Sequence, residues 1–66
     1  MQILVNGQTR SLPDGTTVSA LLQELNLAGK AVAVERNLEV VPHEEHAACR
    51  LAEGDRLEIV TLVGGG

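Results

Sequence analysis

The chain has 66 residues, 44% of them hydrophobic and none aromatic, and its nine acidic and five basic residues give a formal net charge of −4 at pH 7. This length supports a single small domain whose core is built from aliphatic side chains. Scattered basic residues and the lack of aromatic stacking groups argue against nucleic acid and an anionic membrane as partners.

The first elements form a hairpin. Residues 1–5 alternate between apolar and other side chains, which predicts a strand. Asn6-Gly7 follows and favours a two-residue type I′ turn, because both residues tolerate positive φ. Residues 8–12 then return antiparallel, with Ile3 opposite Arg10 in the register that the turn sets. We expect Arg10 at the solvated edge of the buried face.

A helix is expected next. Pro13-Asp14-Gly15 predicts a turn, and Thr17 is the expected N-cap of a helix over residues 18–25. The apolar residues of this stretch recur at the helical spacing and form one stripe: Val18, Leu21, Leu22 and Leu25. Asn26 suits the left-handed position that ends a helix. The stripe is expected to pack on the buried face of the hairpin.

The second half of the chain predicts more strands. Residues 31–35 read as a third strand, Arg36-Asn37 as a turn, and residues 38–41 as a short extended piece ended by Pro42. Residues 43–50 fit one helical turn or an irregular crossover.

The last strand is expected over residues 57–63, with Leu57 and Ile59 on one face. A right-handed crossover after the second strand allows this last strand to lie parallel to the first, in the middle of the sheet. The prediction is an α+β fold of the β-grasp type, a mixed sheet with one helix across one face. Residues 1–63 would form the domain and residues 64–66 a flexible tail.

That tail, Gly64-Gly65-Gly66, is the strongest functional feature of the sequence. Residues without a Cβ form a thin thread that can enter a channel closed to side chains. The α-carboxylate of Gly66 is anionic at neutral pH and can act as a nucleophile. A folded body that presents a reactive carboxylate on such a thread indicates a group carrier and not an enzyme. The alternative is a frayed end without chemistry.

One further segment contains residue types that can bind metal or act as nucleophiles. The spacing His43-x-x-His46-x-x-Cys49 offers three zinc ligands, but a structural zinc site needs four, so we expect a solvated loop and no metal. Cys49 is expected to be a small buried apolar residue. As the only cysteine it forms no internal disulfide, which favours a reducing, cytoplasmic compartment, and we see no signal peptide or membrane span.

A docking patch is expected on the sheet face that points away from the helix. If Ile3, Val5, Leu57 and Ile59 face the helix, the alternation of strands places Leu4, Val60 and Leu62 on the other face. Exposed apolar residues that are scattered singly need no explanation. Three of them beside the start of the tail favour a surface for a protein partner.

The whole chain resembles the ubiquitin-like sulfur carriers of the ThiS type. The stretches that support the resemblance are Gly15-Thr16-Thr17-Val18 with Leu21-Leu22, Val32-Ala33-Val34-Glu35-Arg36-Asn37, Val41-Pro42, Glu53-Gly54-Asp55 and Val63-Gly64-Gly65-Gly66. The resemblance implies a sulfur carrier of thiamine thiazole biosynthesis that works as a monomer and binds no cofactor itself. A ThiF-like enzyme of the ubiquitin-activating type would adenylate Gly66 with Mg-ATP. Sulfur originating from a cysteine desulfurase would then give a thiocarboxylate that serves a ThiG-like thiazole synthase.

Three alternatives stay open. The chain could carry sulfur for another pathway, such as molybdopterin synthesis or tRNA thiolation. It could also be a protein modifier that forms an isopeptide bond through the same carboxylate. Finally, it could be an interaction module with inert glycines.

Overall fold

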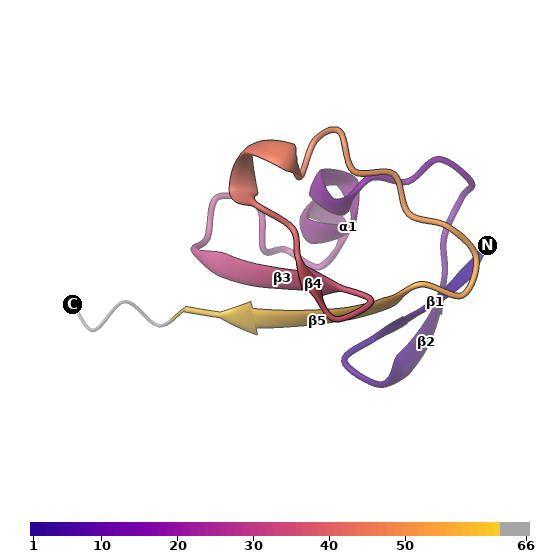
Figure 1. Cartoon of the computed structure of the whole chain (residues 1–66). Helices are drawn as coiled ribbons and strands as arrows, with labels where there is room; N and C mark the ends of the chain where they lie inside the picture. The colour runs from indigo at the N-terminus through magenta and orange to yellow at the C-terminus, as the bar shows by residue number, and fades with distance from the viewer. Residues whose placement is uncertain (63–66) are drawn as a thin grey trace.

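The fold is a five-stranded sheet with one α-helix across one face. A computed structural model describes residues 1–62 (Figure 1). Its elements in chain order are β1 (Gln2–Val5), β2 (Gln8–Ser11), α1 (Val18–Glu24), β3 (Val32–Arg36), β4 (Glu39–Val40), the 3-10 helix η1 (His43–Glu45) and β5 (Arg56–Thr61). No helix in this part of the chain is long and apolar enough to cross a bilayer.

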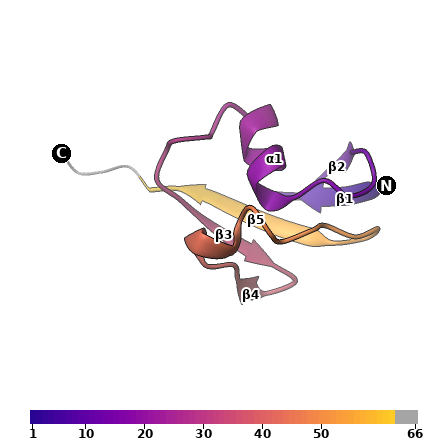
Figure 2. The same ribbon diagram turned by 90° about the horizontal axis from the view of Figure 1, so that it is seen from above.

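The sheet confirms the predicted topology. The strands lie in the order β2-β1-β5-β3-β4, so β5, which is the last strand in the chain, is the middle strand of the sheet. It runs parallel to β1 and antiparallel to β3. The hairpin register is also as predicted, with Ile3 opposite Arg10. Both α1 and η1 lie on one face of the sheet, α1 over the β1 side and η1 over the β3 side (Figures 1 and 2). We call the opposite face the outer face.

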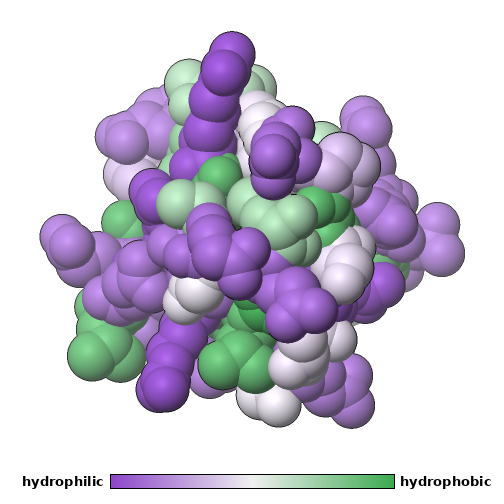
Figure 3. Space-filling model, turned by 90° about the vertical axis from the view of Figure 1, so that its right-hand side faces the viewer, coloured by the Kyte–Doolittle hydropathy of each residue, from purple (hydrophilic) through white to green (hydrophobic). Residues whose placement is uncertain are grey.

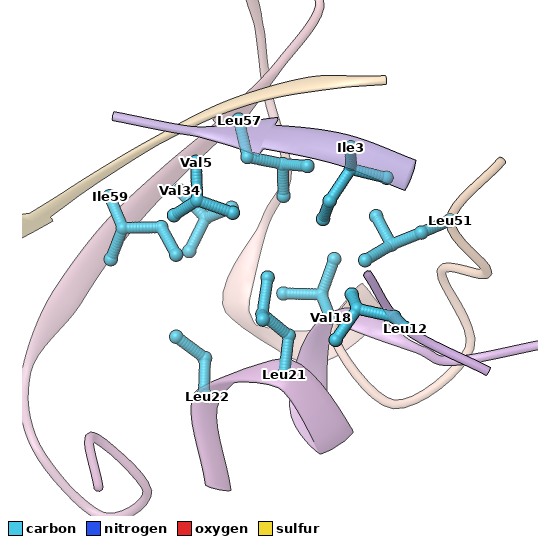
Figure 4. Close-up of a cluster of buried hydrophobic side chains, with 10 residues drawn as sticks. All are labelled: Ile3, Val5, Leu12, Val18, Leu21, Leu22, Val34, Leu51, Leu57 and Ile59. Carbon is cyan, nitrogen blue, oxygen red and sulfur yellow. The ribbon is translucent and has the colours of Figure 1, made fainter. Parts of the chain in front are cut away.

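The core lies between α1 and the sheet, and it is entirely aliphatic (Figure 4). Its most completely buried side chains are Ile3, Val18, Leu21, Val34 and Leu57, each at most 2% exposed. The helix thus contributes the predicted stripe, and β1, β3 and β5 contribute their inward-facing residues. Each such side chain adds about 1.5–3 kcal/mol of burial free energy, which a domain this small cannot spare.

The ends of α1 follow local sequence signals. Thr17 is the N-cap, as predicted, and its Oγ1 accepts a hydrogen bond of 3.1 Å from the Ala20 N–H. At the other end Asn26 has φ of 61°, and the Leu27 N–H bonds to the Leu22 carbonyl at 2.8 Å. The Asn26 N–H bonds to the Gln23 carbonyl, so the two bonds complete a Schellman motif. Leu27 then packs against the core.

The turn between β3 and β4 corrects the prediction by one residue. The turn expected at Arg36-Asn37 lies at Asn37-Leu38, whose φ angles are 52° and 72°. Arg36 remains in β3 because it pairs with Leu57 of β5, and its guanidinium bonds to Asp55. Leu38 is therefore forced into a left-handed conformation that leucine rarely adopts.

Candidate functional site

Strand β5 leads from the middle of the sheet to the glycine tail. Its inward residues Leu57 and Ile59 are buried, and the Leu62 N–H still bonds to the Ala31 carbonyl at 2.9 Å beyond the end of the strand. The backbone is thus held on the β3 side up to Leu62. The predicted tail residues 64–66, and the expected domain boundary after residue 63, lie outside the described residues.

A side chain replaces backbone on the other side of β5. The parallel ladder with β1 covers only Leu4 with Arg56 and Val5 with Leu57, because β1 ends at the hairpin turn. Beyond it the Asn6 side chain takes over. Its Nδ2 donates to the Ile59 carbonyl at 3.1 Å, and its Oδ1 accepts from the Ile59 N–H at 2.8 Å. Asn6 therefore supplies the hydrogen bonds of one more strand residue and supports β5 closer to the tail.

The start of β5 is fixed by a buried carboxylate. Asp55 is 6% exposed and accepts hydrogen bonds from Arg36 Nε at 2.8 Å, Asn37 Nδ2 at 3.0 Å and the Ala52 N–H at 2.8 Å. Burial by itself would raise the pKa of the Asp55 carboxyl, but the bonds from Ala52, Asn37 and Arg36 lower it below its ordinary value. The same contact with Asp55 raises the pKa of Arg36. This cluster ties the β3–β4 hairpin to β5.

The helix N-terminus is already occupied within the fold. The Val18 N–H bonds to the Cys49 carbonyl at 2.9 Å, and the Ser19 N–H bonds to the His46 carbonyl at 3.0 Å. Together with the Thr17 cap, these bonds use the backbone donors with which a helix start could hold a phosphate. Phosphate binding at this position would require these bonds to break.

Of the predicted docking residues, Leu4 and Val60 lie on the outer face, whereas Leu62 follows the end of β5 and lines the hollow beside α1, so the three do not form one patch. Val60 and Leu62 are 56% and 54% exposed, whereas Leu4 is half-buried. Leu4 lies opposite Arg56, so four positions of β5, about 13 Å, separate it from Val60. At the end of the molecule where β1 begins, hydrophobic areas are small and separated by hydrophilic side chains (Figure 3). Val60 and Leu62 remain the pair nearest the tail.

The segment with His43, His46 and Cys49 differs from the expected solvated loop. His43 is exposed, but His46 is only 4% exposed, and its Nε2 lies 3.0 Å from the Val41 carbonyl. A carbonyl only accepts, so Nε2 carries a proton. Cys49 is half-buried and packs against the core, close to its expected role. Within residues 1–62, no three His, Cys, Asp or Glu side chains are arranged to hold a metal.

Sequence reasoning missed two exposed apolar residues at the far edge of the sheet. Leu38 is 91% exposed and Val40 is 69% exposed, more than either Val60 or Leu62. The sequence predicts the extended piece but not its place at the edge of the sheet. The short strand between a turn and Pro42 was the available signal, because edge strands are short and tolerate proline.

Comparison with known proteins agrees with this architecture. The ThiS family model matches residues 3–66. The sulfur carrier protein ThiS of Escherichia coli is 33% identical over 66 residues, which is the full length of both chains. A crystal structure of the thiamine biosynthesis protein ThiS from Geobacter metallireducens superposes over the whole of both chains with a TM-score of 0.84 at 33% identity.

Other relatives are much longer proteins. A thiazole synthase of Paramagnetospirillum magneticum is 47% identical over all 66 residues of this chain, which spans only 20% of that protein. A second thiazole synthase, from Magnetococcus marinus, shows the same coverage at 42% identity. The chain therefore covers about a fifth of the length of these relatives.

The family match and the full-length match to a sulfur carrier agree with the carrier that the glycine tail predicts. The superposition confirms the predicted β-grasp fold, since strand order, crossover and helix position all agree with it. Both the sequence and the structure lead to one conclusion: the chain belongs to the ThiS family of sulfur carriers.

Proposed function

We propose that this protein carries sulfur for thiamine thiazole biosynthesis as a thiocarboxylate of Gly66. One observation supports this above all: the family match runs to residue 66, so it includes the three glycines. Gly64 and Gly65 would form the thread that enters a partner's active site, where a side chain would not fit. The reducing environment that suits the lone Cys49 points to the cytoplasm as the place of this work.

The chemistry needs little from this chain beyond its carboxylate. A Gly66 carboxylate oxygen would attack the α-phosphorus of ATP and displace pyrophosphate, which leaves an acyl-adenylate. Sulfide, released from a persulfide of the sulfur donor by a thiol reductant, would then attack the acyl carbon and displace AMP, which leaves the thiocarboxylate. The occupied N-terminus of α1 supports the view that ATP and Mg²⁺ bind to a partner, since the donors at Val18 and Ser19 already have acceptors.

Three partners follow from this role. A ThiF-like adenylyltransferase would activate the carboxylate, a cysteine desulfurase would be the sulfur source, and a ThiG-like thiazole synthase would receive the sulfur. Support for the last comes from the two thiazole synthases that contain a segment similar to this chain in the same polypeptide. Docking would use the outer face and the end of β5, with Leu4, Val60 and Leu62 as contacts.

The test is ATP–pyrophosphate exchange with the cognate ThiF-like enzyme. Removal of Gly66 draws the carboxylate back by roughly 3.5 Å, the reach of one extended residue. A misplacement of ~1 Å already costs about a hundredfold in rate, so exchange should fall at least that far. Gly65→Val should fail for a different reason, because a branched side chain would block the channel. Circular dichroism should show wild-type melting temperatures for both variants.

Mass spectrometry of the protein purified from its own cells separates the alternatives. Replacement of one carboxylate oxygen by sulfur would support the carrier. Ladders of conjugates on lysine side chains would support the protein modifier instead. Exchange at the wild-type rate without Gly66 would show that its carboxylate is not the reactive group, and the carrier proposal would be abandoned.

A further inference from the structure

The tip of the β3–β4 hairpin combines exposure with backbone strain. Leu38 has φ of 72°, in the region that favours glycine, and its side chain is 91% exposed. The strain lowers stability, and the exposed side chain returns almost no burial. Such strained residues concentrate at functional sites. Folding alone gives no reason for leucine at this position.

The neighbouring outer face brings two carboxylates together. Glu35 of β3 lies directly opposite Glu58 of β5, and on its other side it lies opposite Val40 of β4. Residues opposite one another in a sheet share a face, and like charges in that arrangement repel. The two ion pairs among residues 1–62 involve other groups, so neither carboxylate is neutralised by one.

These features surround one hollow. A depression of about 330 Å³ is lined by Glu35, Asn37, Leu38, Arg56 and Glu58. It is therefore bordered by the apolar side chain of Leu38, by the carboxylates of Glu35 and Glu58, and by Arg56. The next pair of residues on the same face is Ala33 opposite Val60, so this face leads from the hollow toward the end of β5.

We propose that Leu38, Val40, Glu35 and Glu58, the β4-edge surface, dock a protein partner that inserts an arginine or lysine between the two carboxylates. The apolar surroundings of that cation would pack on Leu38 and Val40. This inference rests on the proposed function and extends it by a second contact region. The partner is the thiazole synthase, because relatives with that name hold a similar segment in the same polypeptide. A second copy of this chain is disfavoured, since it would bring four carboxylates face to face.

The experiment is calorimetric titration of the protein into the thiazole synthase of the same organism. Leu38→Gly should weaken binding about tenfold, as loss of a buried apolar anchor does, while raising Tm by about 4 °C through relief of strain. The double variant Glu35→Gln/Glu58→Gln should also bind about tenfold more weakly than wild type at low salt. The difference in affinity between the two proteins should become smaller at high salt. Glu24→Gln/Glu44→Gln is the matched control. This control removes the same number of negative charges, but from α1 and η1 on the opposite face of the sheet. Its affinity for the synthase should stay within about twofold of the wild-type value.

Several results would overturn the inference. These are wild-type affinity of both surface variants, an equal loss in the control, or no binding of wild-type protein to the synthase. Concentration-dependent self-association that Leu38→Gly abolishes, measured by sedimentation, would assign the surface to a second copy. Pyrophosphate exchange by the wild-type protein tells the two proposals apart. If exchange proceeds and the surface variants bind the synthase normally, only the proposed β4-edge surface is wrong. If exchange is absent, the proposed function is wrong.

Discussion

The buried carboxylate of Asp55 gives the sharpest test of how the fold holds β5. Asp55→Asn keeps the shape of the side chain but removes its charge and turns one of its two acceptors into a donor. The three groups that bond to Asp55 are all donors, from Arg36, Asn37 and Ala52. At least one of them therefore loses its acceptor, whichever way the new amide turns.

The size of the effect follows from the environment. A hydrogen bond to a charged group contributes about 1.5–3 kcal/mol, and Asp55 is nearly buried. The Arg36 side chain is 32% exposed, so water can partly replace the lost bond. We therefore expect a loss of about 2 kcal/mol in the free energy of unfolding, which lowers Tm by about 10 °C in a domain of this size.

Far-UV circular dichroism with urea and thermal unfolding is the suitable assay, because the chain has no aromatic residue for fluorescence. Asp14→Asn is the matched control: this side chain is 94% exposed and should change stability by less than about 0.5 kcal/mol. If Asp55→Asn and Asp14→Asn unfold at the same urea concentration and temperature, the Asp55 carboxylate does not stabilise the contact between the β3–β4 hairpin and β5. Our account of the cluster would then be wrong.

Three further outcomes are expected. The pKa of Asp55 is lower in the folded protein than its ordinary value of 3.8, so the ionised carboxylate stabilises the fold fully above that pH. This stabilisation is lost as the pH falls through the folded-state pKa. Wild-type protein should therefore lose more stability below about pH 4 than Asp55→Asn does. Asn6→Gly keeps positive φ accessible but removes the side-chain amide that bonds to Ile59. The free energy of unfolding should fall by about 1 kcal/mol, and hydrogen exchange of the Ile59 amide, measured by NMR, should become faster. Unchanged exchange would contradict the role of Asn6 in supporting β5. Val60→Asp should remain folded by circular dichroism and bind the ThiF-like enzyme about thirtyfold more weakly by calorimetry, and equal affinity would remove Val60 from the docking surface.

Much of the fold could be predicted because its signals are local. Asn6-Gly7 sets both the turn and the register of the first hairpin, and Thr17 and Asn26 mark the two ends of the helix. Each of these signals acts over a few residues and does not depend on the rest of the molecule. The alternation of apolar residues in β5 then assigned its two faces correctly.

The polar contacts that hold β5 could not be predicted in the same way. Asn6 meets Ile59 across 53 positions, and Arg36 meets Asp55 across 19. Nothing in the sequence near Asn6 indicates that its amide will continue a parallel ladder after β1 has turned away. His46 shows the same limit, because a single polar segment with histidine is typical of a solvated loop. The structure buries it all the same, with its Nε2 3.0 Å from the carbonyl of Val41, five residues earlier in the chain.

The turn between β3 and β4 lies one residue later than predicted. This shift explains why the sequence did not reveal the exposed Leu38, which is informative about function. Propensity favours Asn37 at positive φ and disfavours Leu38, so local reasoning placed the turn one residue early. Tertiary contacts decided otherwise, because Arg36 pairs with β5 and binds Asp55 and therefore stays in the strand. Glycine at position 38 would satisfy the same turn without strain. A leucine there gives up stability and exposes an apolar side chain next to Glu35, which is what a docking surface requires and a folding signal does not.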